Sequence, residues 1–379
     1  MTFPTVVAKR LEYLQHIFAE QYDYMSCLPC NHCRIRNMQT PDIKSQKKKA
    51  VALLSGGLDS NLAVRIMREQ GIDVEAVSIK TPFCDFDCGR GCGHNLKEVA
   101  SDLGIKLKTI YLGEDYLKMV KHPKHGYGSG MNPCIDCRAM MYRSAKVHMD
   151  EIGADFLITG EVLSQRPMSQ NKRALQIIER AAEVEGKVVR PLSGKNLPPS
   201  EPEISGLIKR ENLYSISGRS RKEQLKLAKH YGINDPPNAA GGCLLTDRSF
   251  SNRLRDLITK CDFDMTLNDV ELLKVGRHFR LSDTAKLIVG RKEEENEIIS
   301  SLSRSNDLLL EVIEYKGPVG MIRASDPKSV LITAAAIVLR YSDAPKLRAS
   351  AVGVYTGDQI LFSMNSIPCE ESLLDNLRI

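Results

Sequence analysis

The chain has 379 residues and a formal net charge of +6, and 42% of its residues are hydrophobic while 26% are charged. This is the composition of an ordinary soluble protein that is long enough for two or three domains with well-buried cores. The longest apolar run, Val330 to Leu339, is half of the roughly 20 residues that a membrane-spanning helix needs, which argues against a membrane span. The N-terminus has no apolar signal core, so we expect a cytoplasmic protein.

Three cysteines near the N-terminus have a spacing that metal sites use. Residues 4–25 have the apolar spacing of one amphipathic helix, and Cys27, Cys30 and Cys33 follow it. Two C-x-x-C steps place three thiols within reach of one ion. We therefore expect residues 1–40 to form a helix and a Cys-rich knuckle that binds zinc or an iron–sulfur group. Three unrelated thiols are the alternative.

The most informative stretch is VALLSGGLDS, residues 51–60. Its apolar residues predict a buried parallel strand, and the amphipathic residues 61–70 predict the helix that follows. Glycines at such a turn let the backbone approach a ligand, and the first N–H groups of the helix point toward it. We therefore expect a phosphate here, although a tight turn that binds nothing has the same local pattern. No lysine follows the glycines, so this is not a G-x-x-x-x-G-K-[ST] loop.

Strands and helices alternate after this loop. Apolar runs at 73–79, 105–112 and 154–159 predict three more strands with helices between them. This alternation indicates an α/β fold with a doubly wound parallel sheet. Ligands of such sheets bind at the carboxyl ends of the strands, so we expect Gly160, directly after the fourth strand, to lie at the ligand-binding edge.

A second group of candidate residues consists of cysteines. Asn132 and Pro133 predict the start of a long helix with Cys134 and Cys137 in its first turn. A helix N-terminus favours thiolates, so we expect a pKa below the free value of about 8.5. Together with the distant Cys243, these thiols are suited to a 4Fe–4S cluster with one open iron; a zinc ion or a persulfide-and-resolving pair are the alternatives.

Cys84, Cys88 and Cys92 form a third group in a glycine-punctuated loop. Their C-x3-C-x3-C spacing fits no established ligand pattern. A sulfur relay through Cys84 or Cys92 and a loop without function are both consistent with it.

The excess of positive charge is concentrated in one segment. Residues 161–230 contain 14 Lys and Arg against 8 Asp and Glu. This balance favours a polyanionic partner, and a solvated basic face is the alternative. Within the segment, Ser220 and Glu223 have the spacing of a capping box, and Arg219 and Arg221 flank it.

The SGGLDS stretch resembles the SGGxDS loop of PP-loop pyrophosphatases, which split ATP into AMP and pyrophosphate. The MNPCIDC and ITGEV stretches extend the resemblance over residues 50–256 to the tRNA thiolases of that superfamily. The resemblance implies a 50–260 domain that adenylates a tRNA uridine with ATP and Mg²⁺ and then transfers sulfur. The implied phosphate-binding residues are Ser55, Gly56, Gly57 and Ser60, with Asp59 placing Mg²⁺, and the implied cluster ligands are Cys134, Cys137 and Cys243.

Residues 265–379 have the pattern of a separate small α+β domain. Val289-Gly290-Arg291 and Asn296 resemble the VGR…N stretch of the NFACT RNA-binding domain, which implies that this domain contacts RNA. The implied partners are tRNA and a sulfur donor, either sulfide or a persulfide-carrying protein, while a homodimer stays open. The alternative functions are ATP-dependent sulfur or nitrogen transfer to a small molecule and a non-catalytic, metal-stabilised RNA-binding protein.

Overall fold

The computed structural model describes residues 48–84, 96–233, 236, 243–260 and 265–379. Within 1–81, 93–113 and 141–237 the described residues form a first compact unit, and within 82–92, 114–140 and 238–379 they form a second. The predicted N-terminal helix and Cys-rich segment lie outside the described residues. None of the helices in the described ranges is both long enough and apolar enough to cross a membrane.

The first unit contains a five-stranded sheet in the order β3-β2-β1-β4-β5. All neighbouring strands are parallel, with Ala50 opposite Val74 on one side and opposite Phe156 on the other. This confirms the predicted α/β class with a doubly wound parallel sheet. Its strands are β1 (Lys49–Leu53), β2 (Asp73–Lys80), β3 (Leu107–Tyr111), β4 (Phe156–Thr159) and β5 (Val188–Val189).

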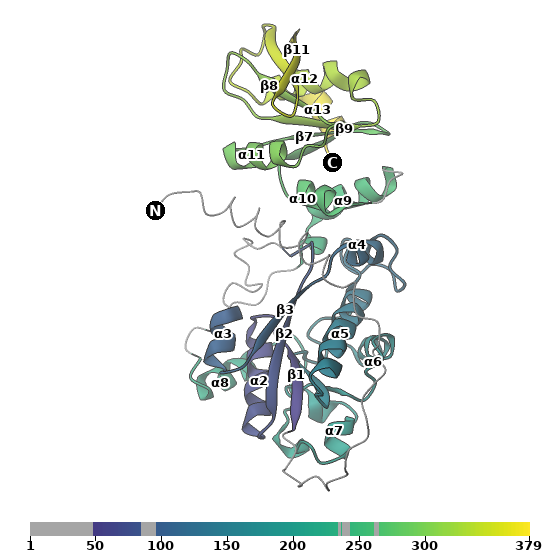
Figure 1. Ribbon diagram of the computed structural model, residues 1–379, viewed down its shortest axis with the longest axis vertical. Coiled ribbons are helices and arrows are strands. Elements are labelled where there is room, and N and C mark those ends of the chain that lie inside the picture. The colour runs from purple at the N-terminus through teal and green to yellow at the C-terminus, as the bar shows by residue number, and fades with distance from the viewer. Residues whose placement is uncertain (1–47, 85–95, 234–235, 237–242, 261–264) are drawn as a thin grey trace, which may run out of the picture. The chain divides into compact units, whose positions relative to one another are not determined.

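Helices cover both faces of this sheet (Figure 1). On one side lie α2 (Leu58–Glu69), α3 (Leu96–Asp102) and α8 (Lys222–His230), and on the other lie α5 (Cys134–Glu151) and α6 (Lys172–Ala181). The alternation of side chains along β1 explains the arrangement, because Ala50, Ala52 and Leu54 enter one core together with Ala63, Val64 and Met67 of α2. The short helix α7 (Glu201–Ile204) follows β5.

The fifth strand is short. The two valines that open 188–192, VVRPL, favour a strand, but β5 ends at Val189. Arg190 instead directs its guanidinium to Glu161 and Glu179, with N–O distances of 3.1 and 2.5 Å. Pro191 then lacks the N–H that a strand needs for its ladder. Two specific side chains therefore override the local preference for strand.

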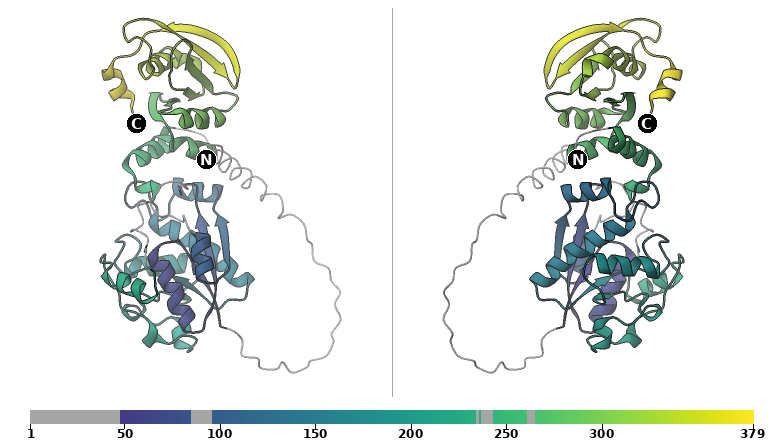
Figure 2. Two further views of the ribbon diagram at one scale, coloured as in Figure 1. Left: turned by 90° about the vertical axis from the view of Figure 1, so that its left-hand side faces the viewer. Right: turned by 90° about the vertical axis from the view of Figure 1, so that its right-hand side faces the viewer.

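The second unit contains a six-stranded antiparallel sheet in the order β11-β10-β8-β9-β7-β6. Strands β10 and β11, drawn in yellow, form a long curved hairpin (Figure 2). The apolar helix α12 packs on one face of the sheet with Leu310 and Ile322, and the opposite face packs against Leu272 and Ile299. This separate sheet with helices confirms the predicted small α+β domain.

The elements of the second unit have the following bounds. The helices are α4 (Glu114–Lys121), α9 (Arg248–Lys260), α10 (Leu267–Leu273), α11 (Glu293–Ser301), α12 (Leu331–Arg340) and α13 (Glu371–Leu377). The strands are β6 (Arg277–Ser282), β7 (Ala285–Val289), β8 (Leu308–Val312), β9 (Gly320–Ala324), β10 (Ser350–Thr356) and β11 (Gln359–Ser366).

Candidate phosphate and thiol sites

The SGGLDS stretch forms the turn between β1 and the first turn of α2. Two serine hydroxyls fix its shape: Ser60 Oγ donates to the Gly57 carbonyl at 2.9 Å and lies 3.2 Å from Ser55 Oγ. The backbone N–H of Ser55 donates to Ser60 Oγ at 3.3 Å. The first N–H groups of a helix have no intrahelical partner, so this turn presents a short anion-binding edge.

Gly160 brings the end of β4 directly against this turn. A Cβ atom on Gly160 would lie 2.4 Å from the Ser60 nitrogen and 2.5 Å from the Asp59 carbonyl carbon, so no larger residue fits without displacing the turn. Strands β1 and β4 are adjacent, and the chain winds outward from them in opposite directions. This is the topological switch point, where ligands of open parallel sheets bind. Gly160 therefore lies at the carboxyl end of β4, as the sequence predicts, and its part in ligand binding stays a prediction.

A buried polar network holds the residue that follows Gly160. Arg190 Nε donates to Glu161 Oε2 at 3.1 Å, and the Tyr142 hydroxyl donates to the same oxygen. Glu161 and Arg190 are 3% and 5% exposed, so each buried charge has its counterion. The network anchors the end of β4 and therefore the position of Gly160.

Asp59 is the acidic residue of the turn, and its two carboxylate oxygens differ. Oδ2 accepts a hydrogen bond from Gln165 Nε2 at 3.0 Å, whereas Oδ1 is buried without a partner among the described residues. Burial raises the pKa of this carboxyl above its ordinary value, and the Gln165 bond and the charges of Arg221 and Arg166 oppose the shift. A buried carboxylate oxygen without a partner fits a site that a cation or ligand completes.

Sequence reasoning did not identify the polar residues around Asp59. Gln165 and Arg166 follow β4, and Arg221 and Gln224 come from the start of α8, where the fully buried Gln224 side chain lowers the pKa of the Asp59 carboxyl. Arg221 was noted only as a flank of a capping box. That capping box was wrong: Arg221 itself is the N-cap without a side-chain cap bond, and Glu223 pairs with Lys226 at 2.9 Å. Ser220 lies one residue before the N-cap, and its hydroxyl accepts from the Lys222 N–H, at 3.4 Å.

Cys134 and Cys137 lie in the first turn of α5, as predicted. The Tyr116 hydroxyl donates to Cys137 Sγ at 3.1 Å, and Tyr116 is only 1% exposed. The ring of Phe83 lies 6.0 Å from that of Tyr116 and 5.9 Å from that of Phe250. An aromatic cluster therefore connects Cys84, the neighbour of Phe83, with the first turn of α5.

A backbone hydrogen bond holds the segment after Cys243 against the loop that precedes α5. Met131 N donates to the Leu245 carbonyl at 2.8 Å, and a Cβ on Gly130 would lie 2.5 Å from that carbonyl oxygen. The loop before α5 and the segment after Cys243 therefore touch at a position that only glycine permits. Burial raises the pKa of the Tyr116 hydroxyl well above its ordinary value. The negative charges that Cys137, Cys243 and Cys84 carry when ionised raise it further.

The environment of Cys137 differs from the prediction. The helix N-terminus suggested a lowered thiol pKa, but burial raises the pKa of Cys137, and the Tyr116 hydrogen bond and the charge of Arg138 only oppose this shift. The expectation of a depressed pKa was wrong at this position because desolvation of the thiol outweighs the helix N-terminus. In the described part of the chain no three Cys, His, Asp or Glu side chains lie close enough to hold a single metal ion. A 4Fe–4S cluster spaces its thiolates more widely than one ion does, and the thiol donor set is the one that such clusters use.

The remaining sequence candidates fall elsewhere. Cys27, Cys30 and Cys33 lie outside the described residues, as do Cys88 and Cys92. His125, in the glycine-rich loop before α5, donates its backbone N–H to Asp136 at 2.9 Å and places Nδ1 2.8 Å from the same carboxylate. These bonds fix the loop to α5 next to Cys137.

Part of the chain is similar in sequence to known proteins. A tRNA-specific 2-thiouridylase MnmA of Marinobacter nauticus is 24% identical over 229 residues, which are 55% of this chain and 54% of that protein. The chain therefore spans about half the length of this curated relative. Two solved structures are also similar: a 4-thiouridine synthetase–RNA complex with bound ATP (TM-score 0.32, 24% identity, 49% of this chain and 52% of that chain) and the U34-tRNA thiolase NcsA of Methanococcus maripaludis with its [4Fe-4S] cluster (TM-score 0.31, 17% identity, 57% and 68%).

Two family models match separate parts of the chain. The NFACT protein RNA binding domain matches residues 276–373, which form most of the antiparallel sheet and its helices. The second model covers residues 45–234, half of the chain, including the SGGLDS turn, Gly160 and both cysteines of α5. Its description is thiamine biosynthesis protein (ThiI), and the chain belongs to this family of PP-loop proteins.

Proposed function

We propose that the chain is an ATP-dependent tRNA uridine sulfurtransferase that forms AMP and pyrophosphate. One observation carries the proposal: the buried Asp59 Oδ1 has no partner within the described residues, and it lies in the phosphate-type turn at the switch point of the sheet. Membership of the ThiI family and similarity to tRNA thiouridylases support the same substrate class.

The first half of the reaction activates a uracil oxygen. A carbonyl oxygen does not leave as oxide, so transfer of AMP from ATP to that oxygen creates a leaving group. Ser55, Gly57 and Ser60 would hold the departing pyrophosphate at the N-terminus of α2, and Gly56 would allow its close approach. Gly160 lets the end of β4 pack against this turn. Mg²⁺ bound at Asp59 would neutralise phosphate charge. Arg166 and Arg221, whose charges act on Asp59, are suited to the same phosphates.

The second half delivers sulfur to the activated ring carbon, from which AMP then leaves. Cys134, Cys137 and Cys243 would hold a 4Fe–4S cluster, which would supply an open iron that binds sulfide. The hydrogen bond from the buried Tyr116 hydroxyl fixes the orientation of the Cys137 thiol. The alternative is a persulfide on one of these cysteines, received from a persulfide-carrying protein in exchange for that protein's thiol, and its sulfur would be released as a second cysteine forms a disulfide. Cys84 is the candidate relay. Sulfide would be the donor for the cluster, and the persulfide-carrying protein would be the donor for the persulfide.

RNA would be held mainly by the second unit and by the basic segment. Residues 265–379 would act as an RNA-binding domain, as the NFACT match supports. The 14 basic residues against 8 acidic ones in 161–230 would add phosphate contacts. Both the ATP site and the thiol site must then act on the same uridine.

The purified full chain should be tested anaerobically with ATP, Mg²⁺, sodium sulfide and bulk unmodified tRNA. We expect thiouridine in the digested nucleosides by mass spectrometry, together with one AMP for each sulfur transferred. AMP formation that requires a small acceptor and no RNA would favour the small-molecule enzyme. A chain that binds tRNA but makes no AMP with any donor would instead be a binding protein.

A further inference from the structure

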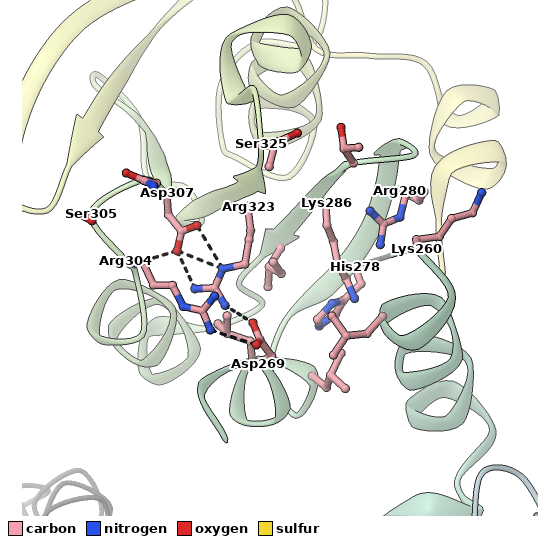
Figure 3. A pocket seen from close by; sticks show the side chains of 17 residues that line it. Lys260, Asp269, His278, Arg280, Lys286, Arg304, Ser305, Asp307, Arg323 and Ser325 are labelled. Atoms are coloured by element: carbon pink, nitrogen blue, oxygen red, sulfur yellow. Dashed lines mark hydrogen bonds and ion pairs between the residues drawn. The ribbon is translucent and has the colours of Figure 1, made fainter. Parts of the chain in front are cut away.

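The second unit contains a pocket of about 440 Å³ that the reaction above does not use (Figure 3). It lies between helices α9 and α10 and the strands β6, β7 and β9. Its apolar wall is formed by Leu257, Leu272, Leu273 and Ile288. A pocket of this size is far larger than the roughly 30 Å³ of one water molecule, so it is suited to an organic group.

Basic side chains surround the apolar wall. The lining includes Lys260, Arg280, Lys286, Arg304 and Arg323, against the acidic Asp269 and Asp307. Carboxylates hold the guanidinium groups in place: Arg280 binds Asp256 through two bonds of 3.0 and 2.5 Å, and Arg323 binds Asp269 at 2.7 Å and Asp307 at 2.6 Å. Two further carboxylates pair with lining residues: Asp256 with Arg280, and Asp283 with Lys260. The five basic and four acidic groups together leave a net charge of +1.

Arg304 is the most exposed of the three arginines that line the pocket. Its side chain is 36% exposed, compared with 16% for Arg280 and 12% for Arg323. Among the described residues, only Nη2 of its guanidinium donates hydrogen bonds, to Thr266 Oγ1 at 2.7 Å and to Asp269 Oδ2 at 3.0 Å. The rest of its fork is available for an anion at the mouth of the pocket.

His278 supplies a buried acceptor at the inner end. The residue is 1% exposed, and its Nε2 lies 2.8 Å from the Val275 carbonyl, which requires a proton on Nε2. Nδ1 then carries a lone pair, and it has no partner in the described ranges. Burial, with the neighbouring charges of Lys286 and Arg253, lowers the pKa of His278 well below its ordinary value, so the ring stays neutral. Figure 3 shows the ends of His278 and Lys286 beside each other.

These groups define the chemistry of one ligand. The apolar wall of Leu and Ile side chains would contact the flat face of a ring in the ligand. On the edge of that ring, an N–H group would donate to His278 Nδ1, and a neighbouring acceptor would receive a hydrogen bond from the Lys286 ammonium. An anionic group at the mouth matches Arg304. We propose that this pocket receives one unstacked nucleotide of a single-stranded RNA segment, with its base against the apolar wall and its phosphate at Arg304.

This inference rests on the proposed function, since it assumes that the substrate is RNA. The full chain should be irradiated with a single-stranded RNA that carries one 5-iodouridine, and the cross-linked peptide identified by mass spectrometry. We expect a cross-link within β6, at or beside His278. Cross-links confined to other segments would overturn the pocket while leaving tRNA as the substrate. A chain that retains no RNA at low salt would overturn the proposed substrate itself.

Binding measurements with matched variants provide the second test. We expect Arg304→Gln and His278→Gln to weaken binding of a labelled single-stranded RNA at least fivefold. Arg68→Gln makes the same charge change at an exposed site in the last turn of α2, outside the segments proposed to bind RNA, and should change binding less than twofold. Thermal unfolding of each variant verifies that it is folded. Equal effects of Arg304→Gln and Arg68→Gln would contradict the pocket. Competition by free UMP as strong as that by the RNA would show that the ligand is a free nucleotide and overturn the RNA assignment.

Discussion

The Gln165 side chain donates a hydrogen bond to Asp59 Oδ2 across 3.0 Å, although the two residues are 106 positions apart. The bond partly offsets the burial that raises the pKa of Asp59, and it leaves the other carboxylate oxygen without a partner in the described part of the chain. The proposed ATP site therefore depends on the segment after β4 as well as on the SGGLDS turn.

Asp59→Asn should abolish most AMP formation and leave RNA binding intact. The substitution keeps the shape of the side chain but removes the charge that would place Mg²⁺, and loss of one preorganised electrostatic group typically lowers kcat by about 10²–10³. AMP release and filter binding of tRNA measure the two properties. Asp150→Asn, at an exposed position on α5, is the control and should retain full activity. Equal AMP formation by the Asp59 variant would exclude this site.

Gln165→Leu should shift the pH dependence of ATP cleavage. Cleavage that needs ionised Asp59 falls as pH drops through the raised pKa of this carboxyl. Loss of the Gln165 bond, which lowers that pKa, should raise it further and move the acid limb of the pH–rate profile to higher pH. Rates between pH 5 and 8 for wild type, Gln165→Leu and the exposed Gln176→Leu test this. An unchanged acid limb in Gln165→Leu would show that Asp59 does not control it.

Gly160→Ala should weaken ATP binding and destabilise the first unit. The added Cβ would meet the Ser60 nitrogen at 2.4 Å, so the turn must move, and overpacking of this kind costs about 1–3 kcal/mol of the free energy of unfolding. Gly113→Ala is the matched control, because its Cβ would have no neighbour within 4 Å. Urea unfolding and ATP titration of both variants measure the effects. A fully stable Gly160→Ala with native affinity would contradict the close approach.

Tyr116→Phe should make the Cys137 thiol still less acidic. The Tyr116 hydrogen bond favours the thiolate, and burial already raises the pKa of this thiol. Without the bond, alkylation of Cys137 by iodoacetamide should need a higher pH, as peptide mass spectrometry of the metal-free chain can follow. Tyr127→Phe removes a hydroxyl that donates to the Val120 carbonyl instead, and it should leave the profile unchanged.

The thiol site can be tested by colour. We expect anaerobically purified protein to be brown, and Cys134→Ala, Cys137→Ala or Cys243→Ala to bleach it, because each removes one proposed ligand. Cys369→Ala, in a half-buried position against the core of the antiparallel sheet, should stay brown. Iron and sulfide analysis quantifies the difference. A colourless wild type that contains stoichiometric zinc would refute the cluster.

The amino-acid sequence by itself determined the features that depend on neighbours in the chain. The glycines and apolar residues of 51–60 specify a strand, a turn and a helix in succession, and Asn132-Pro133 specifies the start of α5 with Cys134 in its first turn. The alternation of strands and helices also predicted the parallel sheet, and therefore the edge at which Gly160 lies.

Only the tertiary structure decided which distant side chains surround these motifs. Arg221 and Gln224 reach the environment of Asp59 from α8, and Phe83 and Tyr116 assemble around Cys137. The sign of the Cys137 pKa shift was wrong from sequence for the same reason, because burial is a property of packing and not of helix position. Local patterns fix backbone conformation, whereas desolvation and non-local hydrogen bonds arise only when the segments pack together.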